Sequence, residues 1–77
     1  PTTVASVRIW SRPQPTPGAR VSGQIGAHGE PMEGSIEVVD GRVIAHLDVP
    51  ARGVAPGQAM AMYDGTRVIG SATIVRP

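Results

Sequence analysis

Cysteine is absent from the 77-residue sequence. This absence excludes disulfide bonds, thiolate metal sites and thiol nucleophiles, and the chain carries no mark of an oxidising compartment. No apolar run approaches the ~18–20 residues that a membrane-crossing helix needs. No charged start followed by an apolar stretch indicates a signal peptide. We therefore expect a cytoplasmic protein that makes no contact with a membrane.

Lysine, phenylalanine and asparagine are also absent, so all seven basic residues are arginines. We interpret this bias as a trace of GC-rich coding. The net charge is only +1, far from the strongly basic balance that by itself indicates nucleic-acid binding. The only aromatic residues are Trp10 and Tyr63. We interpret Trp10 as part of the core or as a lid over it, because a lone Trp in a small domain is usually buried.

The abundant residues favour strands. Ten Val and six Ile stand against the single Leu47, and β-branched side chains pack well on a pleated sheet but lose rotamer freedom in helices. Ten Gly and eight Pro interrupt the chain too often for a stable helix. A chain of this length has room for one core, so we expect residues 1–77 to form a single domain.

Apolar and polar residues alternate in several short stretches, which is typical of strands with one buried face. Asp40-Gly41 predicts a type I′ hairpin turn, and Asp64-Gly65 predicts a second turn of the same kind. Residues 11–19 are rich in proline and are expected to form a surface loop. The predicted strands span residues 4–10, 20–28, 32–39, 42–48, 59–63 and 66–75, and Gly70 interrupts the last of them.

This pattern predicts an all-β fold, a small six-stranded antiparallel β-barrel. Closure into a barrel removes the open strand edges that cause aggregation. In the fourth strand, Val43, Ala45 and Leu47 form the predicted inward set, while Arg42 and His46 belong to the outer face.

No catalytic machinery is recognisable in the sequence. Its six acidic residues fall mostly in turns or on polar strand faces. His28 and His46 have no accompanying ligands at metal-site spacing, and no serine has a Gly-x-Ser-x-Gly setting. No glycine-rich loop precedes a helix. We therefore expect the chain itself to be non-catalytic, with no catalytic, metal-binding or cofactor-binding residue.

Two groups of motifs resemble one known domain. The first runs in order through Arg52-Gly53-Val54-Ala55-Pro56-Gly57-Gln58, Met62-Tyr63-Asp64-Gly65, Val68 and Gly70-Ser71-Ala72-Thr73-Ile74. It looks like the C-terminal domain of bacterial tRNA-specific 2-thiouridylases. Residues 21–30, Val-Ser-Gly-Gln-Ile-Gly-Ala-His-Gly-Glu, resemble the same domain in actinobacterial members. Together the matching segments cover most of residues 20–76.

The resemblance implies a β-barrel similar to the second domain of elongation factor Tu, cut from a longer enzyme. Such an enzyme activates the wobble uridine of certain tRNAs with ATP, with Mg, and replaces its 2-oxygen by sulfur from a donor protein. The ATP-binding loop, of Ser-Gly-Gly-x-Asp-Ser type, and two catalytic cysteines belong to an N-terminal domain in that family, and this chain has none of them. The partners implied are tRNA, the remaining domains of the parent enzyme and its sulfur donor.

For the barrel itself, the resemblance implies a non-catalytic role in holding tRNA against the catalytic domain. At matched positions, Arg52 and His28 are the expected RNA-facing groups, each donating to a phosphate or sugar oxygen, and Arg20 is a further candidate for a phosphate contact. Family members commonly carry Arg where Gly26 stands here. We interpret Gly57 and Gln58 as structural, with Gly57 shaping a turn and Gln58 bridging backbone groups.

The alternative hypothesis is a structural or protein-interaction barrel with no direct RNA contact. It would use apolar strand faces, together with Met60 and Met62, to pack against a neighbouring domain. The modest basic count and the few aromatic residues favour this alternative for the isolated chain, because non-specific RNA affinity grows with the number of phosphates neutralised.

Overall fold

The structure, a computed structural model, describes residues 2–26 and 29–77. These residues contain no helix, and therefore none that could cross a membrane. They form six strands, which are β1 (Val4–Ile9), β2 (Arg20–Gln24), β3 (Met32–Val39), β4 (Arg42–Leu47), β5 (Ala59–Asp64) and β6 (Arg67–Arg76).

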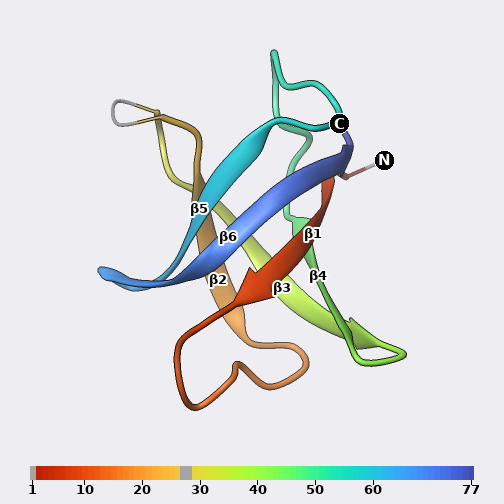
Figure 1. The fold of residues 1–77 in the computed structure, drawn as a ribbon. Coiled ribbons are helices and arrows are strands. Elements are labelled where there is room, and N and C mark those ends of the chain that lie inside the picture. The colour runs from red at the N-terminus through yellow and green to blue at the C-terminus, as the bar shows by residue number, and fades with distance from the viewer. Residues whose placement is uncertain (1, 27–28) are drawn as a thin grey trace.

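The strands form a closed barrel in the order β1-β4-β3-β2-β5-β6, with β6 pairing back to β1 (Figure 1). Every neighbouring pair is antiparallel. The two long connections, residues 10–19 and 48–58, lie at opposite ends of the barrel (Figure 1). The predicted antiparallel barrel and the proline-rich loop are thus confirmed.

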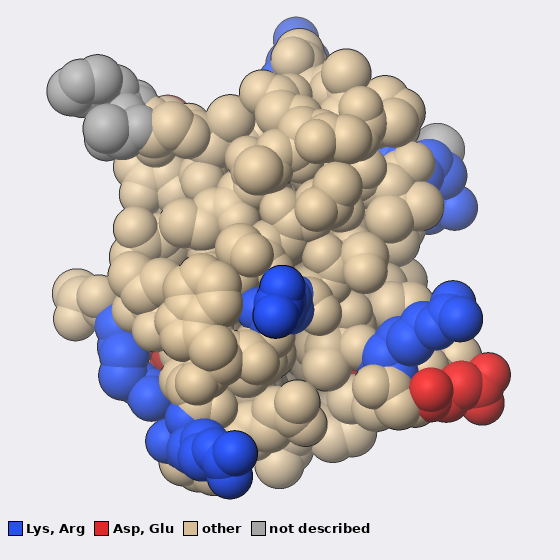
Figure 2. Space-filling view, viewed as in Figure 1, with Lys and Arg blue, Asp and Glu red and all other residues tan. Residues whose placement is uncertain are grey.

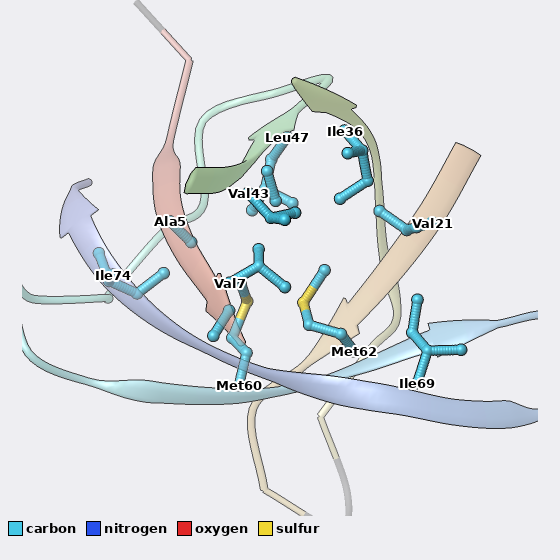
Figure 3. Close-up of a cluster of buried hydrophobic side chains, with 12 residues drawn as sticks. Ala5, Val7, Val21, Ile36, Val43, Leu47, Met60, Met62, Ile69 and Ile74 are labelled. Atoms are coloured by element: carbon cyan, nitrogen blue, oxygen red, sulfur yellow. The ribbon is translucent and has the colours of Figure 1, made fainter. Parts of the chain in front are cut away.

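The core fills the interior of the barrel and draws on every strand (Figure 3). Along each strand, buried and more exposed residues mostly alternate, because successive side chains point to opposite faces. The alternative hypothesis placed Met60 and Met62 on an outer docking face, and this is wrong, since they are 2% and 0% exposed. The buried apolar residues are Ala5, Val7, Val21, Ile36, Val43, Ala45, Leu47, Met60, Met62, Ile69, Ala72 and Ile74.

The two tight hairpins use different turns. Asp40 and Gly41 have φ angles of 51° and 76°, the pair of positive values that a type I′ turn requires, so this prediction is confirmed. In the second hairpin Asp64 still belongs to β5 and pairs with Arg67, so the central residues are Gly65 and Thr66. Only Gly65 has a positive φ, at 61°, as in a type II′ turn. The prediction of a second type I′ turn was wrong because pairing extends one residue further.

Strand β2 ends at Gln24, whereas the predicted strand continued to residue 28, and the last two residues of that prediction lie outside the described part of the chain. Gly26 then takes a positive φ of 71°, and Gln24 Nε2 donates a hydrogen bond to the Gly29 carbonyl oxygen at 2.7 Å. The chain therefore turns away from the sheet soon after Gln24 and leaves no room for a longer strand.

Strand β6 is continuous through Gly70, although the sequence suggested an interruption there. Gly70 pairs with Ile9 of β1 and Met62 of β5. The β5–β6 register shifts between Met62 and Tyr63, so that Ile69 is an extra residue in β6, as in a β-bulge. The glycine thus permits a bulge inside the strand rather than ending it.

Thr3 is the one buried polar residue among those described, with 0% exposure. Its Oγ1 accepts a hydrogen bond from the Ala51 backbone N–H at 2.7 Å, and its carbonyl oxygen accepts one from the Leu47 N–H at 3.0 Å. Thr3 therefore ties the start of β1 to the 48–58 connection.

Candidate functional site

Arg52 lies on the 48–58 connection, exposed at one end of the barrel. It lines a shallow depression of about 270 Å³ together with Gly29 and Glu30. Within residues 2–26 and 29–77, no carboxylate forms an ion pair with its guanidinium. Of the three residues predicted to face RNA, Arg52 is thus exposed and has no ion-pair partner among the described residues.

Arg20, at the start of β2, is engaged within the chain. Its Nη1 donates to Asp48 Oδ1 at 2.9 Å, and its Nη2 donates to Asp48 Oδ2. This hydrogen bonding raises the pKa of Arg20 and lowers the pKa of Asp48. A phosphate would have to displace the Asp48 carboxylate, so the RNA contact of Arg20 stays a prediction that this geometry does not favour.

His28 lies outside the described residues, so its predicted RNA contact stays a prediction. Its described neighbour in sequence, Gly29, lines the same depression as Arg52. Gly26, where the family commonly carries Arg, is exposed.

Hydrogen bonds to strand β6 and to the Gln58 side chain hold the connection that carries Arg52. The Gly57 N–H donates to the Ile74 carbonyl oxygen at 2.8 Å, and the Gln58 side chain accepts from the Ala55 N–H at 3.3 Å. Gly57 has a φ of 89°, which favours glycine. The turn role predicted for Gly57 is confirmed. Among the described residues the Gln58 side chain bonds one backbone group, so its bridging of backbone groups stays a prediction.

The residues that line a second, larger depression were missed by sequence reasoning. It has a volume of about 650 Å³ and lies on the outer side of β5 and β6. Trp10 and Tyr63, the only aromatic residues of the chain, both line it, as does Val68. We call it the aromatic depression, and its lining residues are Trp10, Gln24, Gly26, Ala59, Met60, Ala61, Tyr63, Val68, Gly70 and Ser71.

Trp10 is 59% exposed, so the interpretation of it as a core or lid residue is wrong. The sequence held a signal for this. Trp10 has the same parity as Arg8 and the opposite parity to the buried Val7, and alternation along β1 turns Arg8 outward. The general tendency of Trp to be buried overrode that local pattern.

Charged side chains are scattered over the wall formed by β1, β5 and β6 (Figure 2). Most blue side chains there are separated by uncharged surface and two lie next to each other at the lower left, but no continuous basic stripe crosses this wall. Ion pairs occur on both sides of the barrel. Arg20 pairs with Asp48, and Arg67 Nη2 on β6 lies 3.5 Å from Asp64 Oδ2 on β5. His46 Nε2 and Glu37 Oε1 lie 2.7 Å apart.

In the described part of the chain, no three His, Asp or Glu side chains gather into a group that could hold a metal ion. Two surfaces are the functional candidates, the exposed Arg52 on its end connection and the aromatic depression on the side wall.

Comparison with known proteins identifies the family. Residues 2–74 match the model of the aminomethyltransferase β-barrel domain. The chain belongs to that family. It is also 49% identical over 65 residues to the tRNA-specific 2-thiouridylase MnmA of Streptomyces coelicolor, a match that covers 84% of this chain. The proteins of the same name from Cutibacterium acnes and Mycobacterium avium are 44% and 47% identical over 66 and 55 residues, or 86% and 66% of this chain.

These matches confirm the resemblance to the C-terminal domain of bacterial, mostly actinobacterial, 2-thiouridylases. The barrel domain spans only 17% of the length of the Streptomyces coelicolor relative, 18% of the Cutibacterium acnes relative and 15% of the Mycobacterium avium relative. No solved structure matches the barrel.

Proposed function

We propose that this chain is the C-terminal barrel of a tRNA-specific 2-thiouridylase and that it helps to position tRNA for 2-thiolation of the wobble uridine. The observation that carries the proposal is the match of residues 2–74 to the barrel domain, together with relatives that are named tRNA-specific 2-thiouridylases. The enzyme as a whole would work in the cytoplasm, where it meets tRNA.

The reaction itself would take place elsewhere in the parent polypeptide. That part would bind ATP with Mg, carry the catalytic cysteines and receive sulfur from a donor protein. The barrel has no cysteine and so supplies no thiol to the reaction. Its contribution would be affinity for tRNA and the orientation of tRNA, both of which act through non-covalent contacts.

Arg52 is the residue of this chain best placed for a direct tRNA contact. It is exposed, it has no carboxylate partner among the described residues, and its connection is fixed at Gly57 and Gln58. A guanidinium on a fixed loop can donate two parallel hydrogen bonds to a phosphate at little further cost in conformational entropy.

The test is a titration of the full-length parent enzyme with unmodified tRNA at several salt concentrations. Arg52→Ala is expected to weaken binding and to lower the slope of log affinity against log salt by about 1, as loss of one phosphate contact does. Arg42→Ala, on the exposed β3–β4 hairpin, is the matched control and should leave both quantities unchanged. An Arg52→Ala enzyme with unaltered affinity and slope would rule out the contact at Arg52.

The second candidate function is a structural or protein-interaction barrel with no direct RNA contact. The aromatic depression favours it, because no charged side chain is found among its lining residues in the described part of the chain. Under this alternative, tRNA affinity of the parent enzyme would be the same with and without every exposed arginine of the barrel.

A further inference from the structure

The aromatic depression has the features of a surface that another protein surface covers. We infer that the larger remaining part of the parent polypeptide docks in this depression through an apolar, uncharged surface of its own. The inference needs the chain to be one domain of a longer protein, but it does not depend on the barrel touching tRNA.

The first support is the exposure of its walls. Trp10 is 59% exposed and Val68 is 43% exposed, and both line the same depression as the half-buried Tyr63. Single exposed apolar residues are common on proteins, but a contiguous group that includes a Trp and a Tyr is typical of a binding surface.

The second support is the floor between these walls. Ala61 on β5 lies opposite Gln24 on β2 and Ser71 on β6, and Ala59 on β5 lines the depression beside them. These side chains are short, apart from Gln24, whose amide is already bonded to the Gly29 carbonyl oxygen. A partner can therefore approach the sheet closely and make contact with Trp10 and Tyr63 at the same time.

The third support is charge, and it separates a protein partner from RNA. RNA binding draws most of its affinity from cations that neutralise phosphates. The described residues that line the depression include neither Arg nor Asp nor Glu, and the surrounding wall has no continuous basic stripe (Figure 2). An interface core depleted of charge and enriched in Trp and Tyr is typical of protein–protein contacts.

The identity of the partner follows from the length of the relatives. The barrel spans 17% of the Streptomyces coelicolor protein. In a parent protein of that length, the much larger remaining part of the polypeptide is covalently tethered to the barrel. Tethering gives the remaining part of the polypeptide a high effective concentration at the barrel surface. An apolar surface of the same polypeptide therefore encounters the depression more often than a separate molecule does, and we take it as the binding partner.

The experiment measures access to the depression in the full-length parent enzyme. A thiol is introduced at the floor by Ala61→Cys, and in a second variant by Ser71→Cys. The matched control is Ser35→Cys, which changes a half-buried residue on β3 that pairs with Arg20 and His46, away from the depression. Each variant is treated with a maleimide without tRNA, and peptide mass spectrometry follows only the peptide with the new thiol.

We expect the thiols at positions 61 and 71 to react more slowly than the one at position 35 by a factor of about ten or more, since labelling needs the docked surfaces to separate. The difference should be the same at low and high enzyme concentration. Equal rates at all three positions would overturn the inference. Protection that develops only with added tRNA would assign the depression to RNA. Protection that grows with enzyme concentration would assign it to a second copy of the protein. Either result would also overturn the inference.

Discussion

The Thr3 hydroxyl accepts a hydrogen bond from the Ala51 backbone N–H, and so links two segments that are 48 residues apart in the chain. Thr3 is fully buried, so no water molecule can replace this acceptor without a change in packing. The contact fixes the connection that carries Arg52 to the strand that begins the barrel.

Thr3→Val keeps the shape of the side chain but removes the acceptor. We expect it to lower the free energy of unfolding by about 1–3 kcal/mol, because the Ala51 N–H, on a half-buried residue, loses its partner. Urea denaturation followed by circular dichroism measures this loss. Thr3→Ser keeps the hydroxyl and should cost less than Thr3→Val, and the reverse order would contradict the role given to the hydrogen bond.

Gly70 is the glycine whose replacement we expect to be most damaging among those in strands. A Cβ added to it would collide with the Arg8 carbonyl oxygen of the neighbouring strand, and backbone atoms inside a closed barrel cannot move aside cheaply. Gly70→Ala should lower the free energy of unfolding by about 3 kcal/mol or more, as measured by chemical denaturation.

The control for this prediction is Gly41→Ala. Gly41 has a positive φ but open space around the position of a Cβ, so alanine there should cost only about 1–2 kcal/mol of backbone strain. If Gly41→Ala proved to be the more destabilising of the two changes, close packing at Gly70 would not be what requires a glycine.

The Arg20–Asp48 ion pair should make the stability of the barrel depend on pH at the acidic end. The hydrogen bond from Arg20 lowers the pKa of Asp48 in the folded state. The stabilising contribution is therefore fully present above the unfolded-state pKa of about 3.9 and is lost as the pH falls through the lower folded-state value. Because both side chains are well exposed, the effect should be small and should shrink with added salt.

This dependence is checked by comparing thermal unfolding of the wild-type chain and of Asp48→Asn between neutral pH and pH 2. The two midpoints should differ most at neutral pH and converge as the pH falls below 4. Midpoints that stay a constant distance apart over the whole range would show that Asp48 does not stabilise the barrel through its charge.

The inward-facing residues and the first hairpin turn could be predicted, because each is determined by residues close together in the sequence. Alternation places Val43, Ala45 and Leu47 on the inner face of β4, and the Asp40-Gly41 pair specifies its own turn. Both depend on steric preferences within a few residues, so no knowledge of neighbouring strands is needed.

The strand order could not be predicted, because alternation says which face of a strand is buried but not which strand lies beside it. The pairings of β1 with β4 and β6, and of β2 with β5, join segments that are distant in sequence. The aromatic depression could not be predicted for the same reason. Trp10 and Tyr63 line one surface only because β1, β6 and β5 are neighbours in the barrel, and the strand order was not known from the sequence. Arg20 and Asp48 were likewise separate surface charges until the fold brought them together.

The pairing of β6 with both β1 and β5 has a consequence for synthesis on the ribosome. Of the six strands, β6 leaves the exit tunnel last, and it is the strand that closes the barrel, so until then β1 and β5 have unpaired edges. A nascent chain arrested before β6 emerges should therefore bind chaperones and be cleaved readily by proteases. Protection should arrive in one step when the final strand is released.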